Sequence, residues 1–156
     1  MEKLKLCILG HMNNNENYSK QYVDLIKENL LENINNAIDF GVETIYLTCK
    51  SDFDILAMEV LVEVKSKNPF IQVYVYTETQ ISTLTEKKYR KTKEILDRCD
   101  FRFCPISYSI MVGKLLEISN CCFIFWESND ILMKNVISYV KNKLFCVKIV
   151  KVDNRT

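Results

Sequence analysis

The feature that most constrains the fold is the regular alternation of short apolar runs with longer amphipathic segments. Apolar or β-rich runs of strand length occupy residues 4–9, 42–48, 70–76, 101–104, 121–126 and 144–150, of which 101–104 is the weakest. Segments with helical spacing of apolar residues occupy 22–40, 56–64, 83–98, 110–118 and 131–143. Because the strand-like runs are apolar rather than alternating, both faces of the strands are expected to be buried. The alternation predicts a three-layer, Rossmann-like α/β fold, with a parallel sheet covered by helices on both faces.

Length and charge agree with one compact unit. The chain has 156 residues, of which 48% are hydrophobic, and we expect a single domain spanning residues 1–156. Lys and Arg number 21 against 20 Asp and Glu, so the basic field typical of nucleic-acid binding is missing and a nucleic-acid partner is not expected. No apolar run approaches the roughly 18 residues of a membrane span. We therefore expect a cytoplasmic protein with no membrane partner.

Seven cysteines raise the question of disulfide bonds or a metal site. Their number is odd, and we expect no signal peptide. Four of them lie in apolar strand-like runs: Cys7, Cys121, Cys122 and Cys146. These are expected to be reduced, small core residues. The paired Cys-x-x-Cys or Cys/His spacing of a zinc site is missing, so neither a metal nor a cofactor is expected.

Polar loops follow several of the predicted strands. In open parallel sheets the ligand crevice lies beyond the carboxyl ends of the strands. Gly10 and His11 end the first strand. A glycine there permits a tight turn and lets a ligand approach the backbone, and the histidine is able to hydrogen-bond a phosphate or a ribose. The simpler alternative is a turn glycine followed by a solvated histidine.

The second loop, residues 48–54, places hydroxyl and carboxylate groups just before a helix. A helix N-terminus binds anions through its backbone N–H groups, although Asp52 or Asp54 is equally able to act as the helix cap. The loop has no glycine, which argues against a phosphate cradle. Glu127 follows the fifth strand, either facing the crevice or in a plain turn. The candidate ligand-binding residues are Gly10, His11, Thr48, Ser51, Asp54 and Glu127.

No catalytic motif is evident. The sequence has no Gly-x-Ser-x-Gly elbow and only one histidine, so no nucleophile with its base is identified. The catalytic residues are unknown, and a non-catalytic protein is favoured. A carboxylate pair such as Asp54 with Glu127, acting on a water molecule, is the alternative that would suit a glycosidic-bond hydrolase.

Several motifs occur in an order that points to a known superfamily. Leu9-Gly10-His11-Met12 ends the first strand, Asp54, Ala57 and Glu59 open the second helix, and Lys65 and Pro69 follow it. Tyr89, residues 95–100 and residues 117–127 continue the pattern. This order resembles the SLOG superfamily, the Rossmann-like domains shared by the DNA-processing protein Smf/DprA and the LOG nucleotide hydrolases. The likeness is greatest to its YpsA-like branch and extends from about Leu6 to Val150.

The resemblance implies a Rossmann-like fold and a nucleotide or nucleotide-derived ligand. The chain also departs from the pattern. Cys49 and Asp52 replace the two loop glycines, and Met111 and Val112 replace an Arg-Asn pair. The Pro-Gly-Gly-x-Gly-Thr-x-x-Glu signature of the LOG hydrolases is absent.

Three functional hypotheses follow. The leading one is non-catalytic binding or sensing of a nucleotide or nucleotide-derived small molecule in the crevice. The second is a degenerate SLOG paralogue that acts as a protein-interaction or oligomerisation module, and a homo-oligomer is expected. The third is a nucleotide N-glycosidic hydrolase that uses Asp54 or Glu127.

Overall fold

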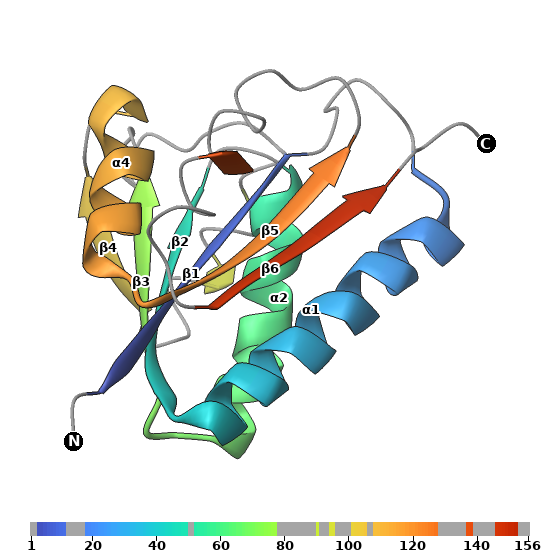
Figure 1. Ribbon diagram of the computed structural model, residues 1–156. Helices are drawn as coiled ribbons and strands as arrows, with labels where there is room; N and C mark the ends of the chain where they lie inside the picture. Colours follow the sequence, from blue (N-terminus) through green and yellow to red (C-terminus); the bar gives the residue numbers. More distant parts are fainter. Residues whose placement is uncertain are drawn as a thin grey trace.

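The computed structural model describes residues 3–11, 18–49, 52–77, 90, 94–95, 101–105, 108–127, 137–138 and 146–152. Strands and helices alternate as predicted (Figure 1). They are β1 (Leu4–His11), α1 (Lys20–Phe40), β2 (Val42–Thr48), α2 (Asp52–Lys67), β3 (Gln72–Thr77), β4 (Phe101–Pro105), α4 (Tyr108–Ile118), β5 (Cys121–Glu127) and β6 (Cys146–Val152). The helices predicted at 83–98 and 131–143 lie mostly outside the described residues.

The six strands form one parallel sheet in the order β4-β3-β2-β1-β5-β6. From β1, successive strands are added on one side as far as β4, and the chain then crosses back to add β5 and β6 on the other side. The order of strand addition therefore reverses between β1 and β5. These two strands pair with each other as far as their carboxyl ends, where Gly10 lies opposite Phe125 and His11 lies opposite Trp126.

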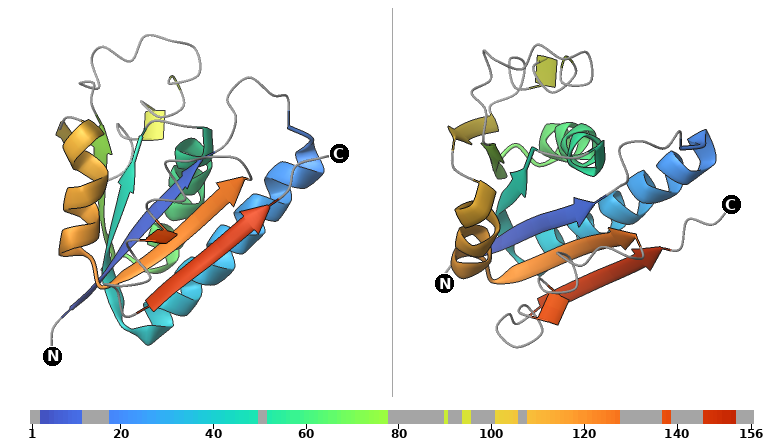
Figure 2. Two further views of the ribbon diagram at one scale, coloured as in Figure 1. Left: turned by 45° about the horizontal axis from the view of Figure 1, so that its top comes forward. Right: turned by 90° about the horizontal axis from the view of Figure 1, so that it is seen from above.

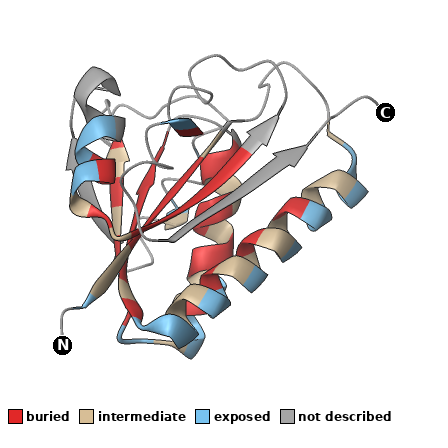
Figure 3. Ribbon diagram, in the orientation of Figure 1, coloured by how far each residue is buried: buried red, intermediate tan, exposed pale blue. Residues whose placement is uncertain are grey.

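Helices cover both faces of the sheet, which confirms the predicted three-layer Rossmann-like fold. Helices α1 and α2 lie on one face and α4 on the other (Figure 2). Side chains alternate between the faces along a strand, so β1 sends Leu6 and Ile8 toward α1 and α2, and Cys7 and Leu9 toward α4. Most of the described residues of β1, β2 and β5 are buried between the layers (Figure 3).

Helix α1 forms because its apolar residues recur on one face and both of its ends are capped. Ile26, Leu30 and Ile34 are buried along that face. The Ser19 hydroxyl oxygen accepts a 3.1 Å hydrogen bond from the Tyr22 N–H at the N-cap. At the other end, Gly41 has a φ of 120°, and its N–H donates to the carbonyls of the last helical turn. None of the described helices is long and apolar enough to span a membrane.

Strand β3 differs from the prediction of uniformly buried strands. Val73, Val75 and Thr77 are buried, but Gln72 is exposed and Tyr74 is only partly buried. The tyrosine rings lie on the face that carries α4, where Tyr46 and Tyr74 pack with their centroids 5.6 Å apart. The face toward α1 and α2 is therefore the fully buried one at this strand.

The two glycines Gly41 and Gly113 should respond in opposite directions to alanine. Gly41→Ala is expected to lower the free energy of unfolding by at least about 1 kcal/mol, because an alanine is strained at positive φ. Gly113 lies inside α4, where an added Cβ atom would have no neighbour within 4 Å. Gly113→Ala should raise the free energy of unfolding by about 0.5–1 kcal/mol. Urea denaturation measures both, and equal effects would contradict this account of Gly41.

Candidate functional site

The parallel sheet brings most of the predicted ligand-binding residues to one edge. His11, Thr48 and Glu127 end β1, β2 and β5, so their backbones lie at the carboxyl edge of the sheet. Gly10 precedes His11, and Asp54 belongs to the first turn of α2, which begins beyond the same edge. Ser51 lies outside the described residues. The edge includes the reversal point between β1 and β5, the position at which open α/β sheets bind ligands.

Asp54 is a buried carboxylate anchored to the end of β2. Only 1% of its surface is exposed, which is rare for an acid unless it has partners. The Thr48 hydroxyl donates a 3.0 Å hydrogen bond to Oδ2 of Asp54. Helix α2 begins at Asp52, so Asp54 is its third residue and the alternative that Asp54 is the N-cap is wrong. Its carboxylate instead places negative charge near the positive end of the helix dipole.

The strand ends beneath this edge are held rigidly. The N–H of Cys49 donates a 3.0 Å hydrogen bond to the carbonyl of Tyr76 and so continues the pairing of β2 with β3. Thr77, at the end of β3, is buried together with Thr48. Buried hydroxyl and carboxylate groups are thus fixed on adjacent strand ends and on the first turn of α2.

Gly10 makes room for an aromatic ring. A Cβ atom at this position would overlap Cδ1 of Phe53, so the Phe53 ring packs directly on the glycine backbone. Phe53 also stacks on Phe125, with centroids 5.1 Å apart and an interplanar angle of 8°. Both rings are fully buried. On the face toward α2, the space expected to admit a ligand is therefore occupied by Phe53.

Phe53 is the residue of this edge that sequence reasoning missed. It is the only apolar side chain between Lys50 and Asp54. A single aromatic residue within a polar strand-to-helix loop is the signal that could have indicated an inward-facing side chain. Its contact with Gly10, by contrast, depends on how α2 is placed over β1.

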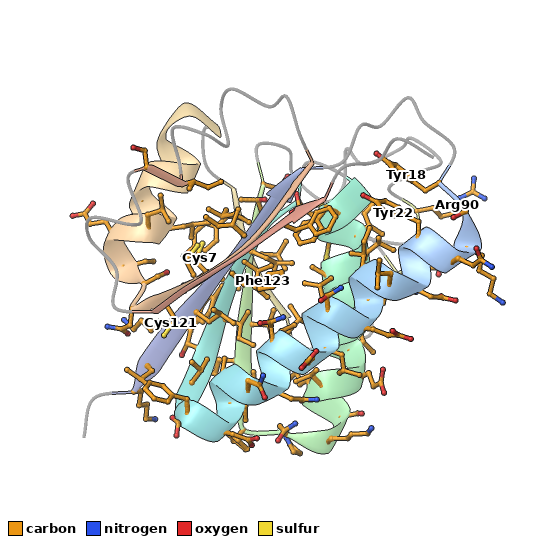
Figure 4. All side chains as sticks on the ribbon, turned by 45° about the vertical axis from the view of Figure 1, so that its right-hand side comes forward. Cys7, Tyr18, Tyr22, Arg90, Cys121 and Phe123 are labelled. Carbon is orange, nitrogen blue, oxygen red and sulfur yellow. The ribbon has the colours of Figure 1, made fainter. Side chains whose placement is uncertain are left out.

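A cysteine pair lies on the opposite face of the sheet. Cys7 and Cys122 are directly paired positions of β1 and β5, and both are free and buried. Figure 4 shows Cys7 on the side of α4 and Phe123 on the side of α1 and α2. The pKa of the Cys7 thiol is raised well above its usual value, first by its hydrogen bond with the Cys122 thiol and then by burial. The Asp54 carboxylate raises this pKa further. Cys7 is thus a poor nucleophile.

The prediction that the cysteines of the strand-like runs are reduced core residues is confirmed for Cys7, Cys121 and Cys122, which are free and buried. Cys49 is free and buried as well, whereas the side chain of the predicted Cys146 lies outside the described part of the structure. Within the described part of the chain, no group of three or more His, Cys, Asp or Glu side chains is placed to hold a metal ion.

Three residues of the superfamily-like motifs make contacts that hold the fold together. Glu59 forms a 2.6 Å ion pair with Lys27, which joins α2 to α1. Nζ of Lys65 donates to the carbonyl of Ile71 and fixes the turn before β3. Oδ1 of Asn120 accepts a 3.0 Å hydrogen bond from the N–H of Lys5, at the start of β1. These contacts lie away from the carboxyl edge.

Comparison with known proteins gives no family assignment. No protein-family model matches the chain, and no curated protein matches it. The resemblance to the SLOG superfamily therefore stays a prediction from the motifs.

The contact between Gly10 and Phe53 can be tested by a double-mutant cycle. Gly10→Ala should lower the free energy of unfolding by about 1–3 kcal/mol through overpacking. Phe53→Ala should lower it by about 3–5 kcal/mol, because it removes a buried ring. In the Phe53→Ala background the Gly10→Ala cost should largely disappear, since the clashing atoms are gone. Additive costs in urea denaturation would show that the two residues are independent.

Proposed function

We propose that this protein binds a nucleotide-derived small molecule, without catalysing its conversion, at the carboxyl edge of β1, β2 and β5. The observation that carries the proposal is the reversal of strand order between β1 and β5. At such a reversal the chain leaves neighbouring strands in opposite directions, and open α/β sheets bind their ligands beyond the carboxyl ends of those strands. That edge includes the backbones of Gly10, His11 and Glu127 and lies next to Thr48 and Asp54.

The polar groups at this edge suit recognition better than group transfer. The Thr48 hydroxyl and the Asp54 carboxylate are buried and hydrogen-bonded to each other, so they fix the end of β2 to the first turn of α2 beneath the edge. The Cys7 thiol is buried on the α4 face of the sheet and is kept protonated. The motif resemblance to the SLOG superfamily supports the class of ligand, a nucleotide derivative.

A thermal-shift screen tests this function. The purified protein is heated with nucleotides, nucleosides, cyclic nucleotides and NAD-derived metabolites. A ligand at about 100 times its dissociation constant should add about 2.7 kcal/mol to the free energy of unfolding. The shift should be lost in His11→Ala and Asp54→Ala and kept in Asp39→Ala, a matched control at an exposed position in the last turn of α1. A cooperative melt that no compound shifts would contradict the proposal.

A second candidate function is assembly with another copy of the chain. The observation that favours it is the exposure of two large aromatic side chains, Phe40 at 72% and Phe70 at 57%. Phe40 ends α1, and Phe70 lies in the turn between α2 and β3. These two segments lie together at the lower edge of the molecule in Figure 1. Exposed aromatic residues are enriched at protein interfaces.

Light scattering tests the assembly. If these phenylalanines form an interface, the wild-type protein should be larger than a monomer, and the double variant Phe40→Ser with Phe70→Ser should be a monomer. The change removes exposed side chains only, so the variant should fold normally. A monomeric wild-type protein would exclude this function.

A further inference from the structure

We propose that the crevice takes an unphosphorylated ligand of the nucleoside or nucleobase class. The space beside Gly10, where a phosphate would meet the start of α2, is filled by Phe53, and Asp54 brings a buried carboxylate to the first turn of that helix. This inference rests on the proposed function and narrows its ligand class.

The first reason is steric. A phosphate bound between a strand-ending glycine and a helix N-terminus must approach the backbone closely, which requires open space above the glycine. Here the Phe53 ring lies so close that even a Cβ atom on Gly10 would overlap it. Phe53 is fully buried and is held in place by its stack on Phe125. A phosphate group could enter only by displacing a core aromatic ring.

The second reason is electrostatic. The first N–H groups of a helix lack partners within the helix and attract anions. Asp54, the third residue of α2, brings a carboxylate to this end, where burial and the Thr48 hydrogen bond fix it. A phosphate at this position would be repelled by a like charge in a poorly screened environment.

Isothermal titration calorimetry of matched ligand pairs tests the inference. The probes are adenosine, guanosine, cytidine and uridine, each paired with its 5′-monophosphate, and inorganic pyrophosphate alone. At least one nucleoside should bind at least about tenfold more tightly than its monophosphate. Pyrophosphate should not bind. The comparison uses the wild-type protein, so it does not depend on the folding of a variant.

Two variants test whether the negative charge of Asp54 causes the preference for the nucleoside over its monophosphate. Asp54→Asn keeps the size of the side chain and an oxygen that accepts from Thr48 but removes the negative charge, so it should reduce the preference for the nucleoside. Asp39→Asn makes the same change at an exposed position and should leave the preference unaltered. A preference in Asp54→Asn equal to that of the wild type would overturn the role assigned to Asp54.

The outcomes distinguish this inference from the function on which it rests. A monophosphate that binds as tightly as its nucleoside, or more tightly, would overturn the inference and leave the proposed function standing. If neither series binds, the proposed function is wrong and the inference falls with it.

Discussion

The fold depends on the burial of β1 on both of its faces, because this strand supplies apolar side chains to the two hydrophobic cores on opposite sides of the sheet. It pairs with β2 along one edge and with β5 along the other, and this pairing satisfies its buried backbone groups. Leu6 and Ile8 enter the layer of α1 and α2, while Cys7 and Leu9 enter the layer of α4. A fully buried Leu or Ile contributes about 1.5–3 kcal/mol. With its interior committed to packing, the strand has room for polar function only at its carboxyl end.

Burial on both faces also explains how much of the fold could be predicted from the sequence. Central strands buried on both faces are mostly apolar, so β1 and β5 are visible as apolar runs and β2 as a run of residues with high β propensity. Strand β3 is the exception, because Gln72 alternates with buried valines and the tyrosines beyond it are only partly covered. Tyrosine suits both a core and a half-exposed face, so composition alone does not decide the burial of such a strand.

The candidate site was predictable in position but not in packing. Parallel strands carry their ends to a common edge, so Gly10, Thr48 and Asp54 could be grouped without coordinates. What fills the space above Gly10 could not be read in the same way, because the Phe53 contact is set by the angle at which α2 crosses β1. Local spacing also does not reveal that motif residues such as Glu59 and Asn120 serve packing and pairing.

The packing of Phe53 on Gly10 also constrains the order in which descendants of this sequence are able to change. Enlarging residue 10 first creates a clash with the ring, and shrinking residue 53 first leaves a void beside Phe125. Either substitution alone costs stability, whereas the two together restore the filled volume. Lineages derived from this chain should therefore exchange the two residues jointly, as a correlated pair, or keep both.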